Sequence, residues 1–114
     1  MQTAAPSREF NDLLLESIDE TITTLLSREV VEALYDHLQT AHSISRQQIP
    51  LRLDELSSIL TKTFGVPGSA TISKSIAKNF YSKLAITFSD NPGGSLLGYV
   101  DRAKKTLQER EGLP

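Results

Sequence analysis

Cysteine is missing from all 114 residues, and long apolar runs are missing as well. Without cysteine the chain can form neither a disulfide framework nor a thiolate zinc site, which fits a reducing cytosol. The longest purely aliphatic run is Leu13-Leu14-Leu15, far too short to cross a bilayer. Met1 to Ser7 has no basic stretch followed by an apolar one, so no signal peptide is expected. These absences predict a cytoplasmic protein without a membrane span.

Patterns that carry catalysis or metal binding are also lacking. His37 and His42 are five residues apart, which is not the spacing that aims two ligands at one metal from a helix. No carboxylate pattern completes such a site, and no serine lies in a nucleophile elbow. We therefore expect no catalytic residue, no metal and no cofactor, and predict that the chain is not an enzyme.

Helical periodicity is the main signal that is present. Apolar residues recur at helical spacing in five segments, approximately 8–26, 28–42, 52–64, 70–85 and 96–110. The apolar stripe of the first segment includes Leu25 and that of the second includes Val30. Serines stand at the expected N-caps: Ser7, Ser27, Ser45, Ser69 and Ser95. This pattern predicts an all-α protein, a compact bundle of about five amphipathic helices.

Short connections complete the predicted bundle. Ser45 to Gln48 has the capping-box pattern of a short helical turn, which Pro50 should end. Gly65 fits the left-handed position after a helix end, with Val66 as the accompanying hydrophobic contact. We expect a disordered tail over residues 1–7, one helical domain over 8–110, and a frayed C-terminus over 111–114.

The charges are distributed unevenly. Residues 1–42 hold two basic and eight acidic residues, a sum of −6, whereas residues 43–114 hold ten basic and six acidic residues, a sum of +4. Such asymmetry indicates a polyanion-binding half, two surfaces that attract each other, or ordinary solvated faces. In the first helix the carboxylates fall on one face, a candidate acidic surface for a basic partner: Glu9, Asp12, Glu16, Asp19 and Glu20.

The segment 70–85 is the complement of that acidic face. No acidic residue occurs from Val66 to Ser89, and a candidate interaction surface lies opposite the apolar stripe: Thr71, Lys74, Ser75, Lys78 and Tyr81. Phe80 already occupies the stripe, so Tyr81 is expected to point about 100° away, towards the lysines. We expect this face to be exposed and to form the main functional surface. Its partner could be the acidic helix of a second copy.

The order of helix, glycine turn and helix in residues 53–85 allows a different interpretation. It has the length of a helix-turn-helix, and a face of Lys, Ser, Thr and Tyr can contact phosphates. However, two lysines are few, and the sequence pI of about 5.6 is far below that of dedicated nucleic-acid binders.

Several local features together resemble the archaeal Nitrosopumilus output domain family, a small all-helical domain. The similar segments cover most of residues 10–107: Leu13 to Glu20, Leu34 to Leu38, Ile44, Ile49-Pro50, Leu60, Phe64-Gly65, Phe80 to Leu84, and Tyr99 to Asp101. The resemblance implies a signal-output domain, alone or attached to sensory modules. It carries over no functional residues. Our hypothesis is a non-enzymatic regulatory module that binds another protein, which could be a second copy; the alternative is a DNA-binding regulator.

Overall fold

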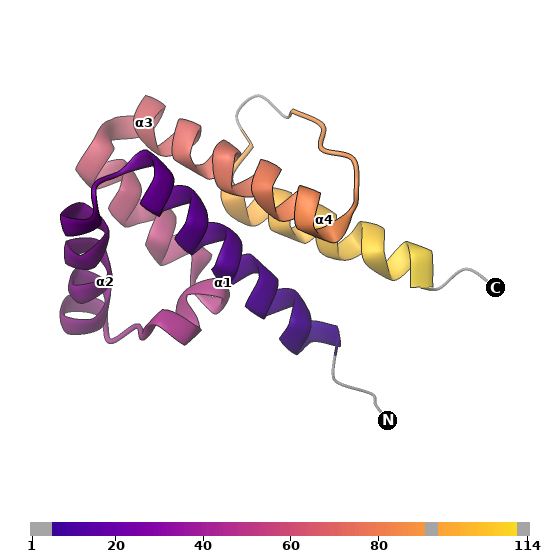
Figure 1. Ribbon diagram of the computed structural model, residues 1–114, viewed down its shortest axis with the longest axis horizontal. Helices are drawn as coiled ribbons and strands as arrows, with labels where there is room; N and C mark the ends of the chain where they lie inside the picture. Colours follow the sequence, from indigo (N-terminus) through magenta and orange to yellow (C-terminus); the bar gives the residue numbers. More distant parts are fainter. Residues whose placement is uncertain (1–5, 91–93, 112–114) are drawn as a thin grey trace.

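The computed structural model describes residues 6–90 and 94–111, with side chains over 10–90 and 94–110. The elements are helix α1 (Pro6–Leu25), helix α2 (Arg28–His42), 3-10 helix η1 (Arg46–Leu51), helix α3 (Leu53–Leu84) and helix α4 (Leu96–Glu111). Figure 1 shows α1 lying along the C-terminal part of α3, with α4 on the other side of it and α2 at one end. The all-α bundle of about five helices is confirmed.

Three of the predicted caps are present. Ser27 Oγ accepts a hydrogen bond from the Val30 N–H at 3.2 Å, and Ser95 Oγ accepts one from the Gly98 N–H at 3.0 Å. Ser45 forms a capping box at the start of η1. The fourth prediction was wrong, because Ser69 lies buried inside α3, where its Oγ accepts a hydrogen bond from Thr61. Ser7 lies within α1, and its side chain is outside the described residues.

The predicted helices 52–64 and 70–85 are two arms of α3, joined at a kink. Gly65 has φ 80° and ψ 170°, so it does take the predicted left-handed φ. The C-terminal arm begins directly at Val66 and Pro67, earlier than predicted, because proline suits the first turn of a helix, where its missing N–H leaves no bond unmade. In Figure 1 the two arms diverge sharply from this kink.

The C-terminal arm of α3 is the centre of the core. It packs against α1 on one side and α4 on the other. Phe80 and Phe10 of α1 meet edge to face, with ring centroids 5.0 Å apart. A helix that is covered on two sides buries more than one stripe of side chains along its length. The buried residues of this arm are accordingly Ser69, Ile72, Ser73, Ile76, Ala77, Phe80 and Tyr81. Only a narrow line of this arm is left facing solvent.

Candidate functional site

Tyr81 is not on the exposed surface where the sequence analysis placed it. Its side chain is 2% exposed, and its hydroxyl donates a hydrogen bond of 2.6 Å to the Tyr99 carbonyl of α4. Phe88 meets the Tyr81 ring edge to face, at 5.3 Å between centroids. Burial raises the pKa of the Tyr81 hydroxyl. The prediction was wrong because α4 covers the side of the helix that lies next to the Phe80 stripe.

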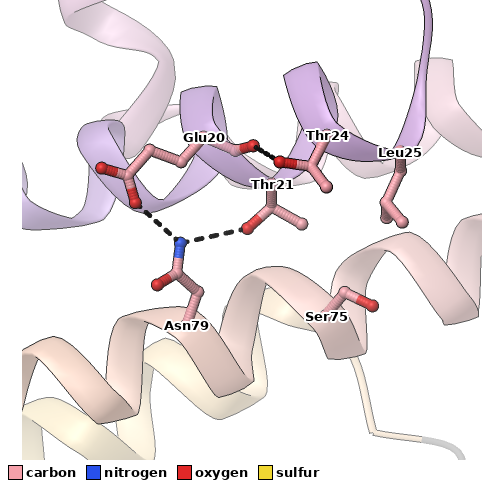
Figure 2. Close-up of a pocket in the computed structure, with 6 residues that line it drawn as sticks. All are labelled: Glu20, Thr21, Thr24, Leu25, Ser75 and Asn79. Carbon is pink, nitrogen blue, oxygen red and sulfur yellow. Dashed lines mark hydrogen bonds between the residues drawn. The ribbon is translucent and has the colours of Figure 1, made fainter.

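The two lysines of the same predicted surface already have partners within the chain. Lys74 Nζ lies 2.7 Å from Asp90 Oδ2, and this bond, more than the nearby charge, holds the pKa of Asp90 below its usual range. Lys78 Nζ lies 5.9 Å from the centre of the Phe88 ring. Thr71 is exposed, but its hydroxyl donates to the Pro67 carbonyl. Ser75 faces α1 instead (Figure 2).

The acidic face of α1 is likewise used inside the molecule. Lys83 Nζ lies 2.8 Å from Glu16 Oε1 and 3.1 Å from Glu20 Oε1. Asn79 Nδ2 also donates to Glu20, at 3.1 Å, and this bond together with Lys83 lowers the pKa of Glu20. The attraction between the acidic and basic halves that the charge pattern suggested is therefore satisfied between α1 and α3. Asp12 is exposed, and the side chain of Glu9 lies outside the described residues.

Asp19, a further member of that face, joins three elements. It accepts a hydrogen bond of 2.9 Å from the Tyr35 hydroxyl of α2 and one of 2.6 Å from Arg46 of η1. Burial, and secondarily the bond to Asp19, raises the pKa of Tyr35 well above its usual value. The cluster fixes α2 and η1 to α1, which is a structural role.

The raised pKa of Tyr35 predicts a loss of stability in alkali. Unfolded tyrosine ionises near pH 10, whereas the folded chain keeps the Tyr35 proton to higher pH. The free energy of unfolding should therefore fall as the pH rises above about 10. The Tyr35→Phe variant, which cannot ionise at this position, should lose less over the same interval. Urea titrations of both proteins at neutral and alkaline pH measure the difference. An equal fall in both would contradict the assignment, because lysine ionisation is common to the two.

Three large apolar side chains are exposed at one end of the molecule. Leu25 is 48% exposed, Val30 38% and Val66 70%. They lie at the C-terminal end of α1, at the start of α2 and at the kink of α3, which Figure 1 places at the same end of the long axis. We call them the kink-end surface. Elsewhere in the described part of the chain, the large apolar residues Leu51 and Leu97 are also exposed, on η1 and α4.

Sequence reasoning missed this surface, because helical spacing assigned Leu25 and Val30 to the core and Val66 to a helix-end contact. All three assignments were wrong for the same physical reason. Each residue lies in the last or first turn of a helical segment, where the neighbouring elements cover it only in part. Their position at helix ends was the available signal.

A shallow recess of about 280 Å³ adjoins the kink-end surface, with which it shares Leu25. Figure 2 shows its walls, which come from α1 and the C-terminal arm of α3: Glu20, Thr21, Thr24, Leu25, Ser75 and Asn79. Asn79 Nδ2 donates to Thr21 Oγ1 at 3.3 Å as well as to Glu20. The volume is slightly below that of a typical small-molecule site, and its amide is already bonded, so the recess is better suited to be the polar margin of an interface.

Neither a cluster of potential metal ligands nor a candidate membrane span occurs in the part of the chain that the structure describes. There, no group of three or more His, Asp or Glu side chains could hold a metal ion. His37 and His42 meet edge to face at 5.4 Å between ring centroids, and His42 lies 3.6 Å from Glu55. Among the described helices, none combines the length and the apolar character needed to span a bilayer.

Among the described residues, the exposed apolar side chains of the kink-end surface, like Leu51 and Leu97, are not explained by internal packing. Comparison with protein-family models, with curated proteins and with solved structures finds no match for the chain.

Proposed function

We propose that the chain is a non-enzymatic regulatory module that binds another protein through the kink-end surface. The observation that carries the proposal is the exposure, at one end of the molecule, of Leu25, Val30 and Val66. Fully covering a leucine or valine side chain contributes about 1.5–3 kcal/mol. Because the three side chains are 48%, 38% and 70% exposed, covering what remains of them contributes about 2–5 kcal/mol, and the rest of the roughly 8 kcal/mol of a micromolar complex must come from other contacts.

The surroundings of the surface fit this role. Hydroxyl groups and Asn79 line the adjoining recess, which gives the apolar side chains a polar margin, as protein interfaces have. A signal-output domain, the role implied by the resemblance described above, would act through such a contact. We therefore propose a regulatory output function in an archaeal cytoplasm.

DNA binding by residues 53–85 remains the alternative, and two contacts weigh against it. Lys74 is paired with Asp90, and Tyr81 is buried, so the predicted phosphate-binding face is reduced to Lys78 and a few hydroxyls. A recognition helix must also enter a groove, whereas α1 and α4 cover two sides of this arm. Binding to random duplex DNA that weakens steeply with salt would favour the alternative.

The Val66→Asp variant tests the proposed function. A buried, unpaired carboxylate at the centre of an apolar contact is costly, so the variant should lose the partner that the wild-type chain captures from extracts of its own cell. Leu51→Asp is the matched control, since Leu51 is 68% exposed but lies on η1. The control should capture the partner as the wild type does.

Circular dichroism should show that both variants are folded, because both positions face solvent. If Val66→Asp and Leu51→Asp capture the same proteins in the same amounts as the wild type, the kink-end surface is not the binding site and the proposal fails.

A further inference from the structure

An extended segment follows α3 and turns back along the outside of that helix. Residues 86–90 have neither helical nor strand structure, and we call them the strap. Figure 1 shows it returning from the end of α3 towards the start of α4. The Ile86 N–H donates to the Tyr81 carbonyl at 3.1 Å, but among the described residues no backbone group of 87–90 forms a hydrogen bond. Beyond its first residue, the strap is therefore held by side chains alone.

Two side chains, Phe88 and Asp90, hold the remainder of the strap. Phe88 is half-buried, and its ring centroid lies 5.3 Å from that of Tyr81 and 5.2 Å from that of Tyr99. Asp90 accepts a hydrogen bond of 3.3 Å from the Tyr99 hydroxyl, and its side chain is 52% exposed. A segment with few buried contacts and no backbone hydrogen bonds belongs to the part of a protein that opens most readily.

The same two side chains engage both lysines of the interaction surface predicted from the sequence. Lys74 Nζ lies 2.7 Å from Asp90 Oδ2, and Lys78 Nζ lies over the Phe88 ring, 5.9 Å from its centroid. The strap thus neutralises one lysine and places an aromatic ring against the other. Whether this face of α3 can meet another molecule depends on the strap.

We infer that the strap opens locally while the helices stay folded, and that its opening makes Lys74 and Lys78 available at the surface. Opening breaks the contacts of the strap side chains with α3 and α4, but α4 should stay in place because it buries Leu96, Val100 and Ala103 itself. The two lysines lie away from the kink of α3, so the opening of the strap does not depend on the function proposed for the kink-end surface.

Single-thiol variants test the local opening, since the chain has no cysteine of its own. Ile86→Cys places a thiol in the strap, where the side chain is 8% exposed; Ile76→Cys places one in the core, at 0%, and Leu51→Cys one in solvent, at 68%. With an aromatic disulfide reagent, Ile86→Cys should react at least about 100-fold faster than Ile76→Cys, yet more slowly than Leu51→Cys. Its rate should depend little on urea below the unfolding transition, whereas that of Ile76→Cys should follow global unfolding.

Adding Asp90→Asn to Ile86→Cys should raise the labelling rate about 2–5-fold, because the exposed ion pair with Lys74 is lost. Asp36→Asn is the matched control, since it removes the same charge from an exposed position on α2 and should leave the rate unchanged. Equal rates and equal urea dependence at positions 86 and 76 would overturn the inference, because the strap would then open only when the whole chain unfolds. A thiol at position 86 as reactive as that of Leu51→Cys would also overturn it, because the strap would not be closed.

Lysine acylation read by mass spectrometry tests the masking without a thiol. An amine must lose its proton to react, and the hydrogen bond to Asp90 raises the pKa of Lys74. Phe88→Ala leaves Asp90 in the chain, so it can raise the reactivity of Lys74 only if the strap opens as a unit; we expect a rise of at least about 2-fold.

Two lysines remote from the strap are internal controls for this measurement. Lys62 is exposed, and Lys83 is bonded to Glu16, so the reactivity of both should be the same in the wild type and in Phe88→Ala. If Lys74 is as unreactive in Phe88→Ala as in the wild type, the strap does not control this face and the inference fails.

Discussion

Ile76→Ala is expected to lower the free energy of unfolding by about 2–4 kcal/mol, the cost of truncating a fully buried aliphatic side chain and leaving a cavity. Ile76 is 0% exposed and lies in the C-terminal arm of α3, which has α1 on one side and α4 on the other. Because the side chains around Ile76 are held in place by helices on two sides, they can move only a little into the cavity. The loss of unfolding free energy should therefore be in the upper part of that range.

Denaturant titration followed by circular dichroism measures this loss. Val66→Ala, at a position that is 70% exposed, is the control and should change the free energy by less than about 0.5 kcal/mol. A similarly small change for Ile76→Ala would mean that the packing of the arm is not as described.

Gly65→Ala is expected to destabilise the protein by about 1–3 kcal/mol, because φ 80° with ψ 170° is a backbone conformation that residues with a Cβ rarely adopt. The added methyl group would not itself clash, since its nearest neighbour, Pro67 Cδ, would be 3.9 Å away. The loss of stability therefore comes from the strained backbone conformation and not from a clash. The chain could relieve this strain only by straightening the kink, which would pull the arm away from α1.

Gly98→Ala is the matched control for this prediction. Gly98 lies in the first turn of α4 and has no positive φ, and a Cβ there would meet only the Ser95 hydroxyl, at 3.3 Å. Two effects oppose each other here: alanine favours a helix over glycine by roughly 0.5–1 kcal/mol, whereas the capping hydroxyl of Ser95 must shift slightly to make room for the Cβ. The net change in stability should therefore be smaller than that of Gly65→Ala. If Gly65→Ala changes stability as little in thermal melts, Gly65 does not hold the kink.

Local signals gave much of the fold. Ser27, Ser45 and Ser95 mark real helix starts because a capping hydroxyl acts within one turn, and Gly65 marks the kink because the backbone there excludes side chains. Neither signal depends on the rest of the molecule. The sequence therefore sufficed for the helices and for the all-α class.

The candidate site could not be predicted in the same way, since it depends on which helix lies opposite which. Tyr81 and Phe80 point in different directions, and both are buried because two helices flank the arm. Conversely, Leu25 and Val30 belong to apolar stripes but are 48% and 38% exposed, because the neighbouring elements cover them only in part. Periodicity defines a face of a helix, and tertiary packing decides whether that face is covered.

The ion pairs likewise depend on which helices pack together. Lys83 was not among the candidate residues, although it binds Glu16 and Glu20 across the α1–α3 contact. The separate acidic and basic stretches were visible in the sequence, but their distance in space was not.

The single-residue junction in α3 has a mechanical consequence. Residues 66–84 form a continuous helix about 28 Å long, at about 1.5 Å per residue. Lys83 and Asn79 fasten α1 to this rod, and the Tyr81 hydroxyl fastens α4 to it. A change in the backbone dihedral angles of Gly65 would therefore rotate this arm as a unit relative to residues 53–64. A rotation of about 10° at Gly65 would displace the far end of the arm by roughly 5 Å, given that length. A partner bound to Val66, the residue next to Gly65, would therefore restrict this rotation.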